Sequence, residues 1–169
     1  AQGSRHVEVR LDAGAAQAHA SGRLLVFAMP AAKAEAAAKD GKVVEVDASA
    51  LAPEAVTLAA MEVPQLVAGQ SVMLDADVLA FPQPFSRLPK GEYYLQAVLD
   101  TNHDNNYGGR GAGDIVSEPT KVRLGNKGRI PTLALTRVLA ERPDPWVAPA
   151  DAPVDVRESL ATARAQTEA

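Results

Sequence analysis

The chain has 169 residues, a formal net charge of -4 and no cysteine. This length fits one domain with an appendage. The acidic balance argues against nucleic-acid binding, because neutralising phosphates requires clustered Lys and Arg. Without cysteine the chain can form no disulfide, thiolate nucleophile or thiolate metal site. No apolar run approaches the roughly 20 residues of a membrane helix, so no membrane span is expected.

The first half of the chain alternates strand-like runs with one helical pattern. His6–Leu11 alternates polar and apolar residues, as a half-buried strand does, and Arg23–Met29 is apolar enough for a central strand buried on both faces. Pro30 and Gly41 bracket an alanine-rich segment that predicts a short surface helix, with a partly ordered loop as the competing interpretation. Further strands are expected at residues 42–47, 55–61 and 71–74.

The second half centres on a loop rich in Asp, Asn and Gly between two strands. Tyr93–Leu99 alternates with a period of two, and residues 75–91 before it are expected to form a loop whose prolines suggest rigidity. After the Asp/Asn loop, residues 115–124 are extended but contain Pro119, which belongs at an edge or a strand start. Residues 130–139 are expected to form the last strand.

Short strands separated by turn residues predict an all-β protein, an antiparallel β-sandwich with a short helical insertion and a C-terminal tail. We expect the sandwich to occupy residues 1–145. Residues 146–169 are then a proline-rich linker followed by a possible short helix at about residues 156–166, for which Asp155 and Glu158 form a capping box.

The order of several motifs resembles the immunoglobulin-like N-terminal domain of large bacterial secreted esterase-like proteins, which precedes an alpha/beta-hydrolase-type domain. The resemblance covers about Arg23 to Val147, and its motifs are SGRLLVF, VMLDADVLAFP, LPKGEYYLQAVLD, GDIVSEPTKVRL and RIPTLALTRVLAERPDPWV. The most specific are LPKGEYYLQAVLD and GDIVSEPTKV. The resemblance implies an immunoglobulin-like fold.

The same resemblance implies a non-catalytic accessory or interaction module, secreted or periplasmic, with a covalently linked or associated hydrolase domain as its partner. A start at Ala1-Gln2 without methionine would suit a processed N-terminus, although an arbitrary boundary would look the same. Two features depart from the family. This chain has no hydrolase domain, and its loop between the two most specific motifs is short and rich in Asp and Asn. No site residue is carried over from the family.

The Asp/Asn loop is the candidate metal site. Asp100, Asn102 and Asp104 reproduce the first half of a calcium loop of the form D-x-[DN]-x-[DN], in which alternate side-chain oxygens converge on one hard cation. Asn106 continues the alternation, and Asp114 could supply the missing carboxylate, as could Glu118. The second half of the motif is absent. A solvated turn, where Asp, Asn and Gly collect for backbone reasons, is therefore the alternative to calcium.

Other candidate sites have simpler explanations. The chain has three histidines, His6, His19 and His103, which are far apart in sequence and are expected to be unrelated surface residues. No serine lies in G-x-S-x-G, and no nucleophile, base and orienting group can be assembled, so an enzyme is not expected.

The alternative function is a stand-alone small-ligand or carbohydrate-binding β-sandwich protein. Six aromatic residues could line a binding platform, although aromatic residues in a sandwich are more often core residues or loop anchors. They are Phe81, Phe85, Tyr93, Tyr94, Tyr107 and Trp146.

Overall fold

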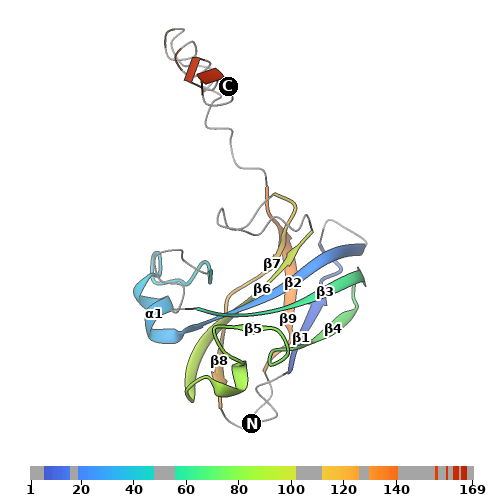
Figure 1. Ribbon diagram of the computed structural model, residues 1–169, viewed down its shortest axis with the longest axis vertical. Coiled ribbons are helices and arrows are strands. Elements are labelled where there is room, and N and C mark those ends of the chain that lie inside the picture. The colour runs from blue at the N-terminus through green and yellow to red at the C-terminus, as the bar shows by residue number, and fades with distance from the viewer. Residues whose placement is uncertain are drawn as a thin grey trace.

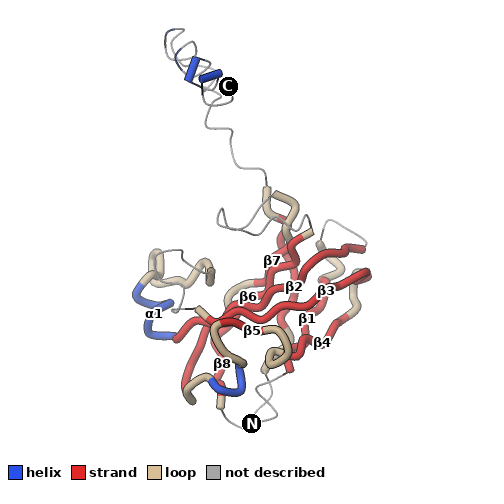
Figure 2. The backbone as a smooth tube through the Cα atoms, viewed as in Figure 1, coloured by secondary structure: helices blue, strands red, loops and turns tan. Residues whose placement is uncertain are grey.

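The computed structural model describes residues 6–15, 19–47, 56–101, 112–125 and 130–140, and residues 155, 159, 162, 163, 165 and 166 of the tail. The described part is β-rich, as predicted, and its strands form one nine-stranded sheet (Figure 1, Figure 2). The strand order is β4-β1-β9-β7-β6-β2-β3-β5, and β8 also pairs with β6. The boundary predicted at residues 145 and 146 lies outside the described residues.

The strands have the following bounds. They are β1 (His6–Leu11), β2 (His19–Pro30), β3 (Thr57–Val67), β4 (Ser71–Asp75), β5 (Ala80–Phe81), β6 (Gly91–Asp100), β7 (Ile115–Ser117), β8 (Thr120–Leu124) and β9 (Leu133–Val138). All pairs are antiparallel except β1 with β9, which is parallel. Pro119 lies between β7 and β8, as its missing N–H predicts, so these strands pair with successive stretches of β6.

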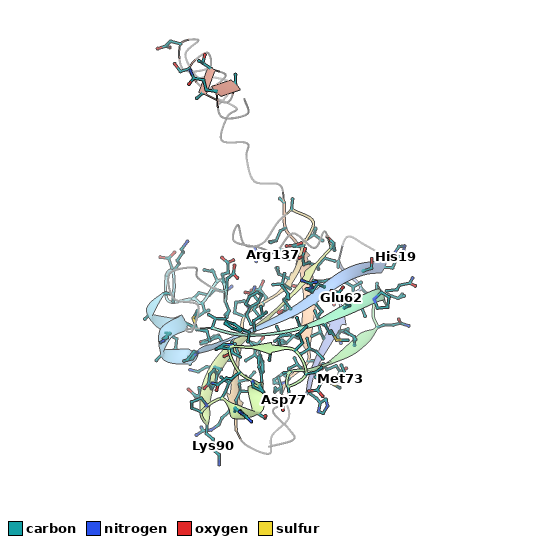
Figure 3. All side chains as sticks on the ribbon, in the orientation of Figure 1. His19, Glu62, Met73, Asp77, Lys90 and Arg137 are labelled. Carbon is teal, nitrogen blue, oxygen red and sulfur yellow. The ribbon has the colours of Figure 1, made fainter. Side chains whose placement is uncertain are left out.

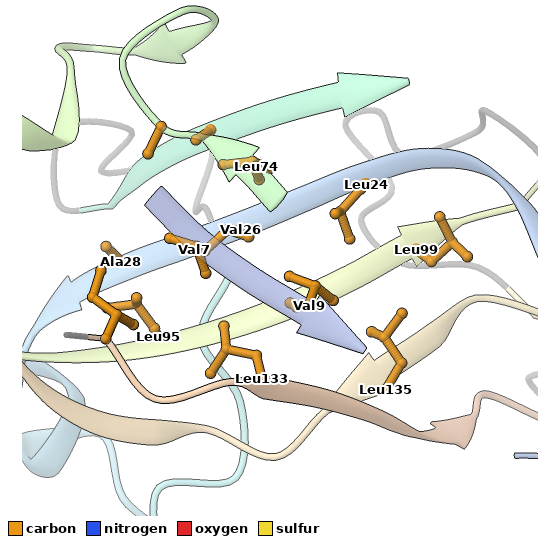
Figure 4. Close-up of a cluster of buried hydrophobic side chains, with 14 of the residues drawn as sticks. Val7, Val9, Leu24, Val26, Ala28, Leu74, Leu95, Leu99, Leu133 and Leu135 are labelled. Carbon is orange, nitrogen blue, oxygen red and sulfur yellow. The ribbon is translucent and has the colours of Figure 1, made fainter. Parts of the chain in front are cut away.

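The main core lies between two parts of this sheet. Side chains of β1, β4 and β9 face those of β2 and β6 (Figure 4). The labelled residues of Figure 4 are nearly or fully buried: Val7, Val9, Leu24, Val26, Ala28, Leu74, Leu95, Leu99, Leu133 and Leu135. Leu24 to Ala28 are all buried, which confirms the prediction of a central strand with both faces covered.

The opposite face of β2 and β6 carries a second apolar cluster. Its buried members are Leu25, Phe27, Val46, Val56, Val98 and Val116. Gln96 is also fully buried here. Its amide oxygen accepts a hydrogen bond from the Val46 N–H, and its amide nitrogen donates one to the Ser117 carbonyl, both at 2.8 Å. These bonds satisfy a polar group that would otherwise be costly to bury.

The prediction of a strand at residues 42–47 is wrong. Lys42 makes only a single bridge with Lys39, and no strand is assigned to residues 43–47. β2 is already paired along both edges, with β3 and β6, and residues 43–47 instead cover the face of the sheet, where Val46 is buried. Val46 therefore reflects burial against the sheet and not pairing within it.

The helical segment is shorter than the alanine-rich pattern predicts. α1 spans Ala31–Ala36 and buries Ala31 and Ala34. Asp40 and Gly41 both have positive φ, 51° and 72°, as a two-residue type I′ turn requires. This turn joins Lys39 to Lys42 through reciprocal backbone hydrogen bonds, so the chain leaves the helix before Gly41.

An exposed polar network connects α1 to the sheet. Lys121 Nζ lies 2.9 Å from Glu35 Oε1 and 3.5 Å from Glu92 Oε2, and the Tyr94 hydroxyl donates to Glu35 Oε1 at 3.2 Å. The hydrogen bond and charge of Lys121 lower the pKa of Glu35 below its ordinary value of 4.5. The network thus favours the ionised carboxylate.

This network predicts a small pH dependence of stability. Because the pKa of Glu35 is lower in the folded state, its ionised carboxylate stabilises the fold. This contribution is fully present above pH 4.5, the ordinary pKa, and is lost as the pH falls through the lowered pKa. Glu35→Gln should remove this acid-side contribution in urea unfolding measured at a series of pH values. The exposed Glu118→Gln is the control and should keep the wild-type profile. Equal pH profiles for Glu35→Gln and wild type would contradict the prediction.

Candidate functional site

Two buried carboxylates lie where β6 and β7 enter the Asp/Asn loop. Asp100 ends β6 and is 2% exposed, and Asp114 precedes β7 and is fully buried. The strands pair Val98 with Val116 and Leu99 with Ile115. Continuing this register by one residue places Asp100 opposite Asp114, at cross-strand positions whose side chains share one face. The structure therefore brings the first and last of the predicted metal ligands to one place.

The backbone around this pair is closely fixed. Thr101 Oγ1 donates a hydrogen bond to the Gly113 carbonyl at 3.2 Å, across the next position of the same register. On the other side, the Gly113 N–H donates to the Leu139 carbonyl at 2.9 Å, and the Leu139 N–H donates to the Asp114 carbonyl at 2.8 Å. The base of the loop is thus bonded to the chain that leaves β9.

Gly22 of β2 packs against the backbone of Asp100. Its φ is +150°, and a Cβ built there would overlap the Asp100 carbonyl oxygen. The register of β2 with β3 shifts between Ala20 and Gly22. A glycine at this bulge allows the close approach of the two backbones beside the buried carboxylate. The sequence alone gave no reason to single out Gly22.

The remaining predicted ligands, Asn102, Asp104 and Asn106, lie outside the described residues, as do His103 and Tyr107. Within the described residues, no group of three or more His, Asp or Glu side chains is placed to hold a metal ion. Asp100 and Asp114 alone would be two ligands of a site, whereas Ca²⁺ takes six to eight oxygens. Backbone carbonyls and the amide and carboxylate oxygens between them in sequence could complete the set.

The described histidines do not form a metal centre. His6 and His19 are exposed, and neither belongs to a metal-binding group of the described residues. His6 Nε2 lies 3.8 Å from Asp75 Oδ2, a weak surface contact. Figure 3 shows His19 at the outer end of β2.

The six aromatic residues do not share one surface. Phe85 and Tyr93 are buried in the main core, 1% and 6% exposed, and burial raises the pKa of Tyr93. The Tyr93 hydroxyl donates to the Pro89 carbonyl. Tyr94, on the opposite face of β6, joins the Glu35 network, and of the four among these six that the structure describes only Phe81 is strongly exposed, at 65%. Tyr107 and Trp146 lie outside the described residues. The burial of Phe85 and Tyr93 agrees with the core role that is expected to be more common than a platform.

A pocket of about 300 Å³ lies on the face of β2 and β3 that carries the second cluster. Its lining is apolar except for an ion pair between Arg23 Nε and Glu62 Oε1, 2.9 Å apart. Figure 3 shows Glu62 on β3 beside β2. The lining residues are Arg23, Leu25, Leu58, Ala60, Met61, Glu62 and Leu79. The sequence alone does not predict this pocket, because its lining depends on the register of β2 with β3.

The site predicts an effect of Gly22 on stability. Gly22→Ala should cost about 1–3 kcal/mol in the free energy of unfolding, because the added Cβ meets the Asp100 backbone at a strained φ. Urea denaturation measures this. Gly69→Ala is the control, since Gly69 also has positive φ but no atom within 4 Å of the built Cβ. Equal losses in the two variants would show that backbone strain, and not the contact with Asp100, determines the cost.

Among the described residues no helix is long and apolar enough to cross a membrane. Comparison of the chain with protein-family models, with curated proteins and with solved structures found no match.

Proposed function

We propose that the chain is a non-catalytic accessory or interaction module, an immunoglobulin-like β-sandwich of an exported hydrolase-like protein, with a calcium-stabilised loop between β6 and β7. The packing of β1, β4 and β9 onto β2 and β6 around one core supports the sandwich. The two most specific motifs of the resemblance, LPKGEYYLQAVLD and GDIVSEPTKV, cover β6, its neighbour β7 and the start of its neighbour β8. They thus belong to one structural unit.

The observation that carries the calcium proposal is the burial of Asp100 and Asp114 at facing positions of the β6–β7 hairpin. Two carboxylates at facing positions, both buried from water, lose hydration on folding, and a divalent cation that coordinates them would favour the folded state. The residues between them supply further oxygen ligands in the alternating pattern of Asn102, Asp104 and Asn106.

The small-ligand or carbohydrate-binding alternative has one supporting observation, the pocket lined by Arg23, Leu58 and Glu62. Burial of Phe85 and Tyr93 removes two of its six aromatic contacts. In addition, Arg23 and Glu62 are engaged with each other. We therefore prefer the accessory module.

The accessory module predicts that the isolated chain gives no turnover in a screen of ester and glycoside substrates. Among the described serines, Ser117 is buried, and its hydroxyl oxygen accepts a hydrogen bond from the Ala97 N–H. That is a structural position, not that of a nucleophile beside a base. Turnover that is abolished by a single point substitution would show that the chain is an enzyme.

Calcium binding predicts a gain in thermal stability. At a calcium concentration of ~100 times the dissociation constant, the folded state gains about 2.7 kcal/mol, which corresponds to about 5–10 °C in Tm for a chain of this size. Thermal melts of the full chain with calcium and with chelator measure the difference. Asp100→Asn and Asp114→Asn each keep the side-chain size, remove one charge and should abolish the calcium response.

The control is Asp75→Asn, in a turn where Asp75 Oδ1 accepts the Asp77 N–H, and it should respond as wild type does. Each variant is compared with itself in chelator, so a loss of intrinsic stability does not obscure the result. Identical melts of the wild type with calcium and with chelator would reduce the loop to a polar turn. The accessory-module proposal does not depend on that outcome.

A further inference from the structure

The segment between the Asp40–Gly41 turn and residue 47 crosses the outer face of the sheet, and we call residues 43–47 the strap. Beneath it are Leu25 and Phe27 of β2, and Val98 and Val116 of β6 and β7. Val46 is its one fully buried residue, and Val43 packs partly against the same cluster. The strap therefore covers part of an apolar face of the two central strands.

Within residues 43–47 the fully buried side chain is that of Val46, and its backbone N–H has a specific partner. The Val46 N–H donates to Gln96 Oε1, and Gln96 is held in turn by the Ser117 carbonyl. Val44 is 45% exposed, and Glu45 is also exposed. A segment with one deeply buried side chain has much less apolar area to lose on opening than a core strand has.

Opening of the strap would leave the sheet intact. Pairing of β2 with β3 and with β6 involves no strap residue, and the main core lies on the other face of these strands. Val26, in that core, is as buried as Val46 but belongs to β2, which is paired on both sides. Exposure of Val26 requires the sheet itself to come apart.

We propose that the strap is a lid that opens as a local unit while the sheet remains folded. The pocket beside it shares Leu25, Leu58 and Ala60 with the apolar cluster that the strap covers. Opening exposes Phe27, Val98 and Val116 beside this pocket. This inference does not depend on the proposed function.

Because the chain has no cysteine, one introduced thiol reports its own exposure. Val46→Cys and Val26→Cys, made in the full chain, replace equally buried valines. Their rates of modification by a thiol-reactive disulfide reagent are measured in urea concentrations below the unfolding transition. The Val46→Cys thiol should react at least about tenfold faster than the Val26→Cys thiol, and with little urea dependence, because local opening exposes little surface.

Val44→Cys is the exposed control and sets the rate for a thiol that needs no opening. Two results would overturn the proposal. A Val46→Cys rate with the magnitude and urea dependence of Val26→Cys would mean that the strap opens only on global unfolding. A rate equal to that of Val44→Cys would mean that the strap is not closed. If Val46→Cys does not fold, hydrogen exchange of the Val46 amide in the wild type tests the same contrast against the Val26 amide.

Discussion

The structure depends on one constraint, the pairing of β2 with both β3 and β6, which leaves β2 without a free edge and with two apolar faces. Each face must be covered because exposed apolar area of this extent is unfavourable in water. One face is covered by β1, β4 and β9, and the other by the strap and its neighbours. The division into two cores follows from this arrangement.

Two buried polar residues, Gln96 and Ser117, fix the positions of the strap and β7, neither of which pairs with β2. Gln96 connects the strap to β7 through Val46 and the Ser117 carbonyl. The Ser117 hydroxyl oxygen accepts the Ala97 N–H where β6 passes from β8 to β7. A buried polar side chain must find partners with specific geometry, so these bonds fix positions that apolar contacts alone would leave less well determined.

The loop end of the hairpin combines the candidate cation site with the exit of the last strand. Asp114 precedes β7, and its carbonyl accepts the Leu139 N–H just beyond β9. The chain continues from this point into a proline-rich sequence. The same backbone hydrogen bonds therefore hold both the base of the Asp/Asn loop and the residue that follows β9.

The sequence by itself determined the β-rich class, the bounds of β1 and β6 to within two residues, the break at Pro119 and the Asp/Asn loop as the candidate site, because alternation, proline and turn residues act locally. Only the tertiary structure decided that Val46 covers a sheet face instead of joining a strand, and that Phe85 and Tyr93 fill the core. The tertiary structure also places Asp100 and Asp114 at buried, facing positions and brings the Asp100 backbone so close to Gly22 that a side chain there would overlap it. These features depend on which strands become neighbours, and strand order is set by contacts between residues far apart in the chain, about which local pattern carries no information.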